Sequence, residues 1–199
     1  MTMTKWELLD EAYATLREAV EGVPADGWDR PTPCAQWNVA QVLQHAAGDQ
    51  LAYAARLTGG PGPAEDPFAP SGVLAGPPAG LLDPALAAAA EAFSAVAPGD
   101  PEVAVPLPPF AVPAETAVGA AALDAAVHAW DIAVATGRPP ALTDALATAL
   151  RPAADVLAEP LRGFAYGPVF PLAPGADHGA AAELLAFLGR DPAWAAPEV

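Results

Sequence analysis

The stretch AETAVGAAALDAAVHAWDIAVATG, residues 114–137, is the longest helical pattern in the chain. Small and apolar residues occupy nearly every side of this expected helix, and Gly137 followed by two prolines is typical of a left-handed C-terminal cap. Asp124, His128 and Asp131 are four and three residues apart, so their side chains lie along one stripe. We therefore predict a core helix whose polar stripe points into a cavity and not toward bulk water.

This polar stripe has two interpretations. Buried carboxylates and imidazoles need partners, and in the first interpretation Asp124 or Asp131 accepts a hydrogen bond from His128 in a structural cluster. In the second, Asp124 and His128 bind one divalent metal, because residues four apart on a helix can reach a single ion. Carboxylate oxygen and imidazole nitrogen suit zinc, iron or nickel. The spacing alone leaves both interpretations open.

A metal site needs a third ligand, and the chain has two other histidines, His45 and His178. Periodicity places His45 on a helix side shared with Gln41, Asp49 and Arg56, which taken alone favours a solvent-facing position. His178 stands at the expected start of the last helix, where the helix dipole disfavours a cation. We therefore expect His178 on the surface.

The single cysteine, Cys34, precedes the second expected helix in the order Thr32-Pro33-Cys34. A helix start can lower the pKa of a thiol, but Arg30 is the only basic residue nearby in the sequence. We therefore interpret Cys34 as a small buried hydrophobe in preference to a reactive or metal-binding thiol. One cysteine forms no internal disulfide, which fits a cytoplasmic protein.

Capping signals and periodicity predict five further helices around the central one. The first three cover residues 4–21 with Thr4 as cap, 38–57 with an Asn38–Gln41 capping box, and 83–96 opened by Asp83-Pro84. A fourth begins at Thr143 and is expected to be kinked or split at Pro152. The fifth covers residues 177–189 and is capped by Asp177. No alternating strand pattern of useful length occurs, apart from an extended stretch at residues 103–107. We predict a single all-α domain over residues 1–199, a bundle of about four long helices with accessory helices.

Two connections, Thr58–Gly80 and Pro98–Pro113, contain too many prolines and glycines for regular elements. Loops of this length are usually functional, so we expect them to form the wall of a pocket.

The charge balance restricts the partners of this protein. Lys and Arg number 8 against 24 Asp and Glu, and the formal charge of −16 excludes nucleic acid and anionic membrane surfaces as general partners. With 53% hydrophobic residues the chain is expected to fold.

No signal-peptide pattern and no run of about 18 uninterrupted apolar residues occurs, so we expect no membrane insertion and a cytoplasmic location. Glycine-rich phosphate loops, serine nucleophile elbows and HExxH motifs are absent.

Three segments together resemble a known family. They are RPTPCAQWNVAQVLQHAAG at residues 30–48, ALDAAVHAWDIAVATGRP at residues 122–139 and LLAFLGRDPAW at residues 184–194. In this order they are similar to the actinobacterial metal-binding branch of the DinB and mycothiol-dependent maleylpyruvate isomerase superfamily. The resemblance covers essentially the whole chain.

The resemblance implies a four-helix bundle with one divalent metal, held by a histidine on the second helix and two ligands on a later helix. Carried over, the ligands are His45, Asp124 and His128, which reverses the solvent-facing interpretation of His45. Asp131 would hold the imidazole of His128 in the correct tautomer. The isomerases have Glu where Asp124 stands, so the metal would sit closer to the helix. We expect zinc first, with nickel or iron as alternatives.

Three protein ligands leave an open position, as in catalytic metal sites. The resemblance implies that a small thiol, mycothiol, binds there as a co-substrate and attacks a small-molecule substrate, giving thiol transfer or isomerisation. Asp49, one turn beyond His45, is the candidate catalytic residue and would act as a proton shuttle. The alternative is that Asp49 is an ordinary aspartate on the solvent-exposed surface. Two other functions stay open: a hydrolase or natural-product tailoring enzyme using metal-bound water or a Lewis acid, and a non-catalytic binding or stress-response module.

Two further expectations concern the limits of the resemblance. The isomerases carry an additional C-terminal domain that contributes to their site, for which 199 residues leave little room. We therefore do not expect maleylpyruvate isomerisation itself. Relatives often form dimers, but the negative charge opposes a homodimer unless an apolar helix face offsets it.

Overall fold

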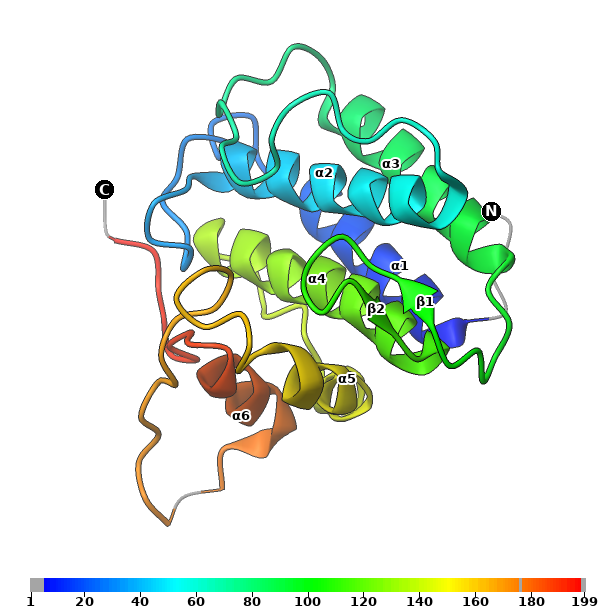
Figure 1. Ribbon diagram of the computed structural model, residues 1–199. Helices are drawn as coiled ribbons and strands as arrows, with labels where there is room; N and C mark the ends of the chain where they lie inside the picture. Colours follow the sequence, from blue (N-terminus) through cyan, green and yellow to red (C-terminus); the bar gives the residue numbers. More distant parts are fainter. Residues whose placement is uncertain (1–5, 176, 198–199) are drawn as a thin grey trace.

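The computed structural model (Figure 1) describes residues 6–175 and 177–197, and nearly all of its regular structure is helical. Along the described chain the elements are α1 (Glu7–Glu21), α2 (Val39–Thr58), α3 (Pro78–Ser94), β1 (Val103–Ala104), β2 (Ala111–Val112), α4 (Ala114–Ala135), α5 (Asp144–Leu157) and α6 (Gly179–Phe187). The predicted all-α class is confirmed.

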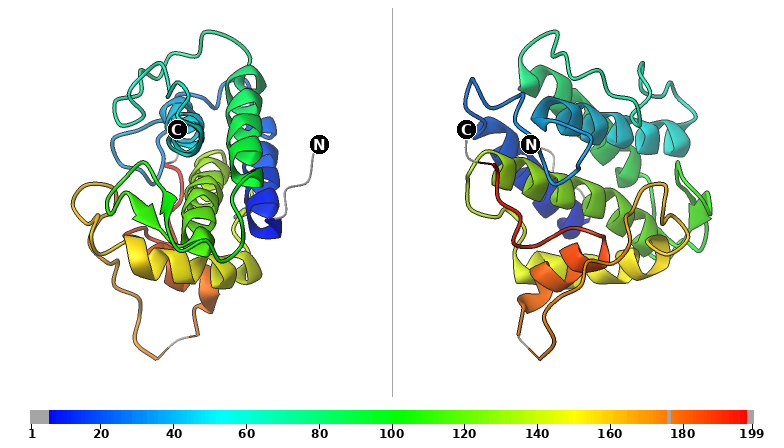
Figure 2. Two further views of the ribbon diagram at one scale, coloured as in Figure 1. Left: turned by 45° about the vertical axis from the view of Figure 1, so that its right-hand side comes forward. Right: turned by 90° about the vertical axis from the view of Figure 1, so that its left-hand side faces the viewer.

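Helices α1 to α4 form the four-helix bundle. Helix α4 packs against α1 on one side and α2 on another, and α3 closes the ring by contacting both α2 and α1. Helix α5 packs on α4 outside this ring, and α6 packs on α5 (Figure 2). The bundle with accessory helices therefore agrees with the architecture predicted from the sequence.

Helix α4 is the core helix of this arrangement. Its length and its mean hydropathy of 1.3 would suit a membrane span, but 89% of that apolar window is buried inside the structure by the surrounding helices. Its small residues let neighbours approach closely. At Gly119, an added Cβ would lie only 2.8 Å from the Cβ of Ala153 on α5. The apolar character of α4 thus serves helix packing in the bundle.

Several predicted helix boundaries are confirmed by their hydrogen bonds. The side chains and backbones of Asn38 and Gln41 form both bonds of the capping box at the start of α2. The hydroxyl of Thr143 accepts from the Leu146 N–H at 3.1 Å and caps α5. Gly137 has φ 74° just after α4, as a left-handed cap requires.

Two boundaries differ from the prediction. Helix α3 begins at Pro78, earlier than the expected Asp83, because a proline in the first turn suits a helix start. Asp83 does not cap this helix; its carboxylate accepts from Arg17 Nε at 2.9 Å and ties α3 to α1. Pro152 lies inside α5 without splitting it, so of the kink or split expected there, the split was wrong.

The first and last helices also start differently from the prediction. The N-cap of α6 is His178 and not Asp177. A carboxylate oxygen of Asp144, on α5, accepts from the Ala181 N–H at 2.8 Å and supplies a cap from another helix. The predicted cap Thr4 lies outside the described residues, and α1 begins after Trp6.

The connection between α3 and α4 contains a small antiparallel hairpin. Strand β1 pairs with β2 so that Val103 lies opposite Val112 and Ala104 opposite Ala111. The extended stretch expected at residues 103–107 is thus a strand only over its first two residues. Both valines are buried, so the hairpin anchors this connection to the core.

The close approach at Gly119 leads to a stability prediction. Gly80→Ala on α3 meets open space, so it should raise the free energy of unfolding by about 0.4–1 kcal/mol by restricting the unfolded chain. Gly119→Ala removes the same backbone freedom but pushes a Cβ into Ala153, which should cost about 1–3 kcal/mol. Urea unfolding of both variants measures the difference. Equal effects in the two would contradict tight α4–α5 packing.

Candidate metal centre

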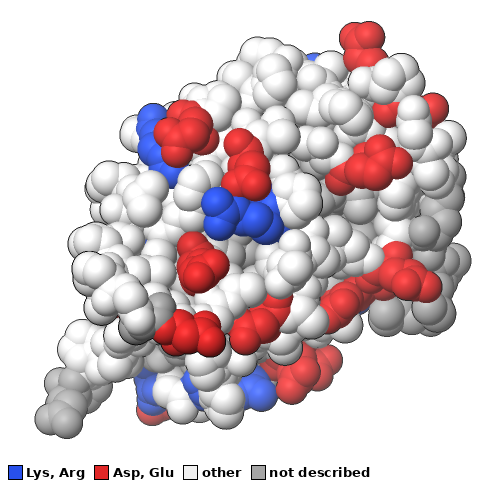
Figure 3. Space-filling model, turned by 90° about the horizontal axis from the view of Figure 1, so that it is seen from below, with Lys and Arg blue, Asp and Glu red and all other residues white. Residues whose placement is uncertain are grey.

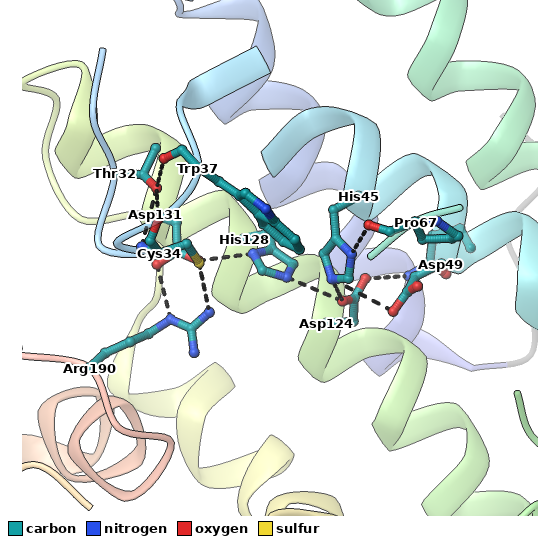
Figure 4. Close-up of polar contacts among 11 residues, drawn as sticks. Thr32, Cys34, Trp37, His45, Asp49, Pro67, Asp124, His128, Asp131 and Arg190 are labelled. Carbon is teal, nitrogen blue, oxygen red and sulfur yellow. Dashed lines mark hydrogen bonds and ion pairs between the residues drawn. The ribbon is translucent and has the colours of Figure 1, made fainter. Parts of the chain in front are cut away.

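The polar stripe of α4 faces α2, and the two helices bring the candidate residues together (Figure 4). Helix α2 carries His45 and Asp49 one turn apart, and α4 carries Asp124, His128 and Asp131 at successive turns. Because each set lies on one side of its helix, all five side chains reach the same region between the helices.

Three of these side chains form a compact group. Asp124 Oδ1 lies 3.4 Å from His128 Nε2 and 3.7 Å from His45 Nε2. The ligand atoms of the three residues all lie within 4.8 Å of one another, and each histidine is only 6% exposed. Two imidazole nitrogens and one carboxylate oxygen at this spacing fit a zinc, iron or nickel ion. The ligand set implied by the resemblance is therefore assembled, and metal binding itself stays a prediction.

The orientation of His45 is set by the loop after α2. Its Nδ1 donates to the carbonyl oxygen of Pro67 at 2.9 Å, which leaves the lone pair of Nε2 directed at Asp124. Burial, followed by the nearby His128, lowers the pKa of His45 to about 4. The ring is therefore a neutral imidazole at neutral pH, the form that binds a metal.

His128 is oriented from its other side. Its Nδ1 lies 2.9 Å from Asp131 Oδ2, so Nδ1 carries the proton and Nε2 faces Asp124. Burial alone would lower the pKa of His128, but hydrogen bonds to Asp124 and Asp131 raise it well above its usual value. The surroundings of Nε2 thus favour a positive charge, which a divalent ion would supply in place of a proton.

Asp131 is held in turn by Arg190, a residue that sequence reasoning did not single out. The guanidinium donates from Nε to Oδ1 at 3.0 Å and from Nη2 to Oδ2 at 2.9 Å, and Asp131 is fully buried. Burial would raise the pKa of Asp131, but the charge of Arg190 and the bond from His128 hold it well below its usual range. Arg190 follows α6, far from α4 in the sequence, so helical spacing could not reveal the pair.

Gln50 is a second residue that sequence reasoning missed. It is fully buried, and its Nε2 donates to Asp124 Oδ2 at 3.1 Å and to the Ala121 carbonyl at 3.1 Å. Its Oε1 accepts from the Tyr13 hydroxyl at 2.6 Å. One oxygen of Asp124 is therefore occupied, and the other is left for the two histidines.

Asp49 lies beside the three-residue group without joining it. It is 9% exposed, and its Oδ2 is 3.8 Å from His45 Nε2, beyond hydrogen-bond distance. No described residue donates a hydrogen bond to it. Burial and the charge of Asp124 raise its pKa well above the usual value. Asp49 lines the cavity described below, so water or a ligand can reach its carboxylate.

The solvent-facing position that periodicity alone favoured for His45, and the solvated alternative for Asp49, are both wrong. The loop after α2 covers this side of the helix: Pro67 accepts from His45, and the Phe68 ring centroid lies 5.3 Å from that of His45. Farther along the same side Arg56 is exposed, as expected. A covering loop cannot be inferred from the period of the helix that it covers.

Cys34 has polar contacts that its interpretation as a small hydrophobe did not include. Its half-buried thiol donates to Asp131 Oδ2 at 3.3 Å and lies 3.5 Å from Arg190 Nη2. Cys34, His128 and Asp131 also have ligand atoms within 4.8 Å of one another. We do not assign a metal there, because Arg190 already occupies both oxygens of Asp131. His178 lies near α6 and bonds the Ala173 carbonyl, outside both groups.

The group opens into a cavity of about 630 Å³. Both predicted loops contribute to its wall, through Phe68 in one and Val105 and Leu107 in the other. Residues 163–167, after α5, add a third wall that the sequence did not predict, and the Phe164 ring centroid lies 4.9 Å from that of Phe68. Segments far apart in the sequence thus meet around one small-molecule-sized space.

Comparison with known proteins identifies the family. Residues 9–133 match the family model described as the mycothiol maleylpyruvate isomerase N-terminal domain. The chain belongs to this family. The match includes most of α1, all of α2 and α3, nearly all of α4 and every residue of the candidate metal group, whereas Arg190 lies outside it. The resemblance to the DinB-like superfamily is therefore confirmed.

Two relatives of this chain come from Mycobacterium tuberculosis, strains CDC 1551 / Oshkosh and ATCC 25618 / H37Rv, and both are described as uncharacterized proteins. Each is 34% identical over 191 residues, covering 90% of this chain and 92% of the relative. No solved structure matches the chain.

The geometry predicts metal stoichiometry. The purified protein should contain or take up about one divalent ion per chain, since three ligands converge on one point. His45→Ala and Asp124→Ala should each lose it, and His178→Ala, outside the group, should keep it. Elemental analysis after dialysis measures the content. Equal metal in the parent and in both ligand variants would contradict the assignment.

The Arg190–Asp131 pair gives a second prediction for this region. Arg190→Met should lower the free energy of unfolding by about 3–5 kcal/mol, because it leaves a buried carboxylate without its cation. It should also weaken zinc binding by about 10–100-fold through a less well oriented His128. Adding Asp131→Asn to Arg190→Met removes the stranded charge and should restore part of the stability. Urea unfolding and zinc titration test this, and unchanged values in Arg190→Met would overturn it.

Proposed function

We propose that this protein is a divalent-metal-dependent enzyme of small-molecule thiol chemistry, a mycothiol-type S-transferase or isomerase. The observation that carries the proposal is the position of His45, Asp124 and His128 together at the wall of a cavity of about 630 Å³. The family description names mycothiol, which supports a small thiol as one of them.

The residues fit a catalytic metal. Two neutral nitrogen ligands and one carboxylate leave coordination positions open toward the cavity, which is the pattern of catalytic sites. We propose zinc as the ion, with nickel or iron as alternatives. Bound there, the ion would keep a small thiol as its thiolate at neutral pH, so that no protein cysteine is needed as nucleophile.

The chain's own residues supply orientation and proton transfer. Gln50 and Asp131 fix the ligand atoms, so the reactants meet a rigid site. Asp49 faces the same space without a donor, and we propose that it accepts the thiol proton. Sulfur then forms a bond to an electrophilic carbon. In a transfer the leaving group departs with the proton from Asp49. In an isomerisation the thiolate adds to one carbon of a conjugated double bond, and the π electrons shift to the adjacent carbonyl group. After rotation about the resulting single bond these electrons re-form the double bond, the C–S bond breaks and the proton returns to sulfur.

Four broader expectations belong to this proposal. We propose that residues 1–199 form one domain, that the partner is a small molecule, that the protein acts in the cytoplasm, and that any homodimer forms through an apolar helix face. Nucleic acid and membrane surfaces remain excluded as general partners by the charge of −16.

The thiol reaction is directly testable. Zinc-loaded protein should catalyse the transfer of mycothiol to 1-chloro-2,4-dinitrobenzene, followed by absorbance, or the isomerisation of an added cis-alkene. His128→Ala should abolish turnover together with metal content. Asp49→Asn should lower kcat by about 10²–10⁴-fold, as loss of a proton-transfer group does, while keeping the metal.

The controls separate this function from its rivals. Turnover that needs metal but is independent of added thiol would point to hydrolysis by metal-bound water. Full thiol turnover in metal-free protein would contradict the proposed role of the histidines.

A further inference from the structure

Two tyrosines in the cavity wall have hydroxyl groups that no described protein atom binds. Tyr53, on α2, and Tyr166, in segment 163–167 after α5, both line the cavity next to the candidate metal ligands. Neither hydroxyl forms a hydrogen bond with a described residue. The third tyrosine, Tyr13, instead donates to Gln50 at 2.6 Å. Two phenol groups are thus left to bind an occupant of the cavity.

Tyr53 shows most clearly that its hydroxyl faces the cavity. The residue is only 8% exposed, and its ring centroid lies 5.9 Å from that of Phe93 on α3. In the described part of the chain every fully buried polar side-chain atom has a hydrogen-bond partner. The unpaired hydroxyl must therefore border accessible space, and the cavity is the space that Tyr53 lines. Water can bind it there, so a ligand that displaces this water binds well only if it supplies an acceptor atom in its place.

The position of Tyr53 on α2 brings this donor close to the metal group. His45, Asp49 and Tyr53 are four residues apart, so they occupy successive turns of one helix side, about 6 Å apart along the axis. Helical side chains lean toward the N-terminus of their helix, which directs Tyr53 back toward Asp49. Tyr166 reaches the cavity from a turn held by backbone bonds, in which its carbonyl oxygen accepts from the Gly163 N–H at 2.8 Å. Two separate segments thus supply the two hydroxyls.

Both tyrosines are neutral and able to donate. Burial, followed by the charge of Asp124, raises the pKa of Tyr53 well above its usual value. The same two causes raise the pKa of Tyr166 to about 12. Since electrostatic effects of this kind weaken with distance, the shared response to Asp124 indicates that both phenols lie near the same candidate ligand. A neutral phenol in this position is a hydrogen-bond donor suited to an oxygen atom of the substrate.

The cations around the cavity are already engaged. Arg190 lies at the opposite end of the labelled polar residues from Asp49 (Figure 4), and its Nε and Nη2 bind both oxygens of Asp131. Arg162 pairs with Glu159. Most basic side chains on the face shown in Figure 3 likewise lie against acidic ones. The charged donors are thus held in ion pairs, whereas the two tyrosines remain as neutral donors close to the metal group.

We propose that Tyr53 and Tyr166 bind the carbonyl oxygen of the electrophile through a pair of hydrogen bonds. The inference rests on the proposed function, since it concerns the same cavity and the isomerisation described for it. When the thiolate adds to the double bond, negative charge moves onto the carbonyl oxygen. Two donors held in advance stabilise that charge more strongly than they stabilise the neutral carbonyl group. The tyrosines keep their protons and act by hydrogen bonding alone.

A matched pair of unreactive probes tests this role. Acetophenone and α-methylstyrene have the same shape, and the oxygen atom of the first is replaced by a methylene group in the second. Tyr53→Phe and Tyr166→Phe each remove one hydroxyl and keep the ring. In NMR titrations that follow the probe signals, we expect each variant to weaken acetophenone binding by about three- to tenfold, the effect of one lost hydrogen bond, and to leave α-methylstyrene within about twofold.

Infrared spectroscopy supplies a second measurement that a merely structural role would not change. The carbonyl stretching frequency of bound acetophenone should be higher in each variant than in the parent, because a C=O group that accepts fewer hydrogen bonds is stiffer. Zinc content should stay unchanged in both variants. The differences should appear in zinc-loaded and in metal-free protein, which separates the tyrosine donors from a carbonyl bound to the metal.

The inference is overturned by an absence of acetophenone binding to the parent, by equal effects of the variants on the two probes, or by an unchanged stretching frequency in either variant. Because the probes need neither thiol nor turnover, the expected tyrosine effects without any thiol catalysis would count against the proposed reaction alone. Thiol turnover without a tyrosine effect would count against the inference alone.

Discussion

The burial of ionisable groups on α4 is the constraint on which the site depends. On a helix covered by α1, α2 and α5, Asp131 is fully buried and Asp124 and His128 are largely removed from water, so each depends on partners in the protein. Those partners come from three separate segments: Gln50 and His45 on α2 serve Asp124, the loop before α2 brings Cys34 to Asp131, and the segment after α6 brings Arg190. The same contacts that make burial tolerable also bind distant parts of the chain together.

This network determines the chemical state of the imidazoles. The Pro67 carbonyl and the Asp131 carboxylate each accept a hydrogen bond from an Nδ1–H group, so both Nε2 atoms point to one carboxylate oxygen. Two rings pre-oriented in this way lose little freedom on binding an ion, which favours a metal over a purely structural role for the cluster.

The family match and the cavity wall cover different parts of the chain. The match ends at residue 133, after the candidate ligands, whereas the cavity wall and the support of Asp131 also use α5 and the segments that follow α5 and α6. The candidate ligands thus lie in the part shared with the family, and the wall of the cavity lies in part in the remainder.

The sequence by itself determined the helical class, most helix positions and the polar stripe of α4, because these depend on local periodicity, capping residues and glycine or proline signals. It identified His45 only through the family resemblance, since a helical period cannot show that Pro67 and Phe68 cover that side. The tertiary structure alone decided that Asp49 is buried, that Gln50 holds Asp124 and that Arg190 pairs with Asp131. Those contacts join residues that are distant in the chain, and no local pattern encodes which of several acidic side chains will lose water and which cation will be close enough to replace it.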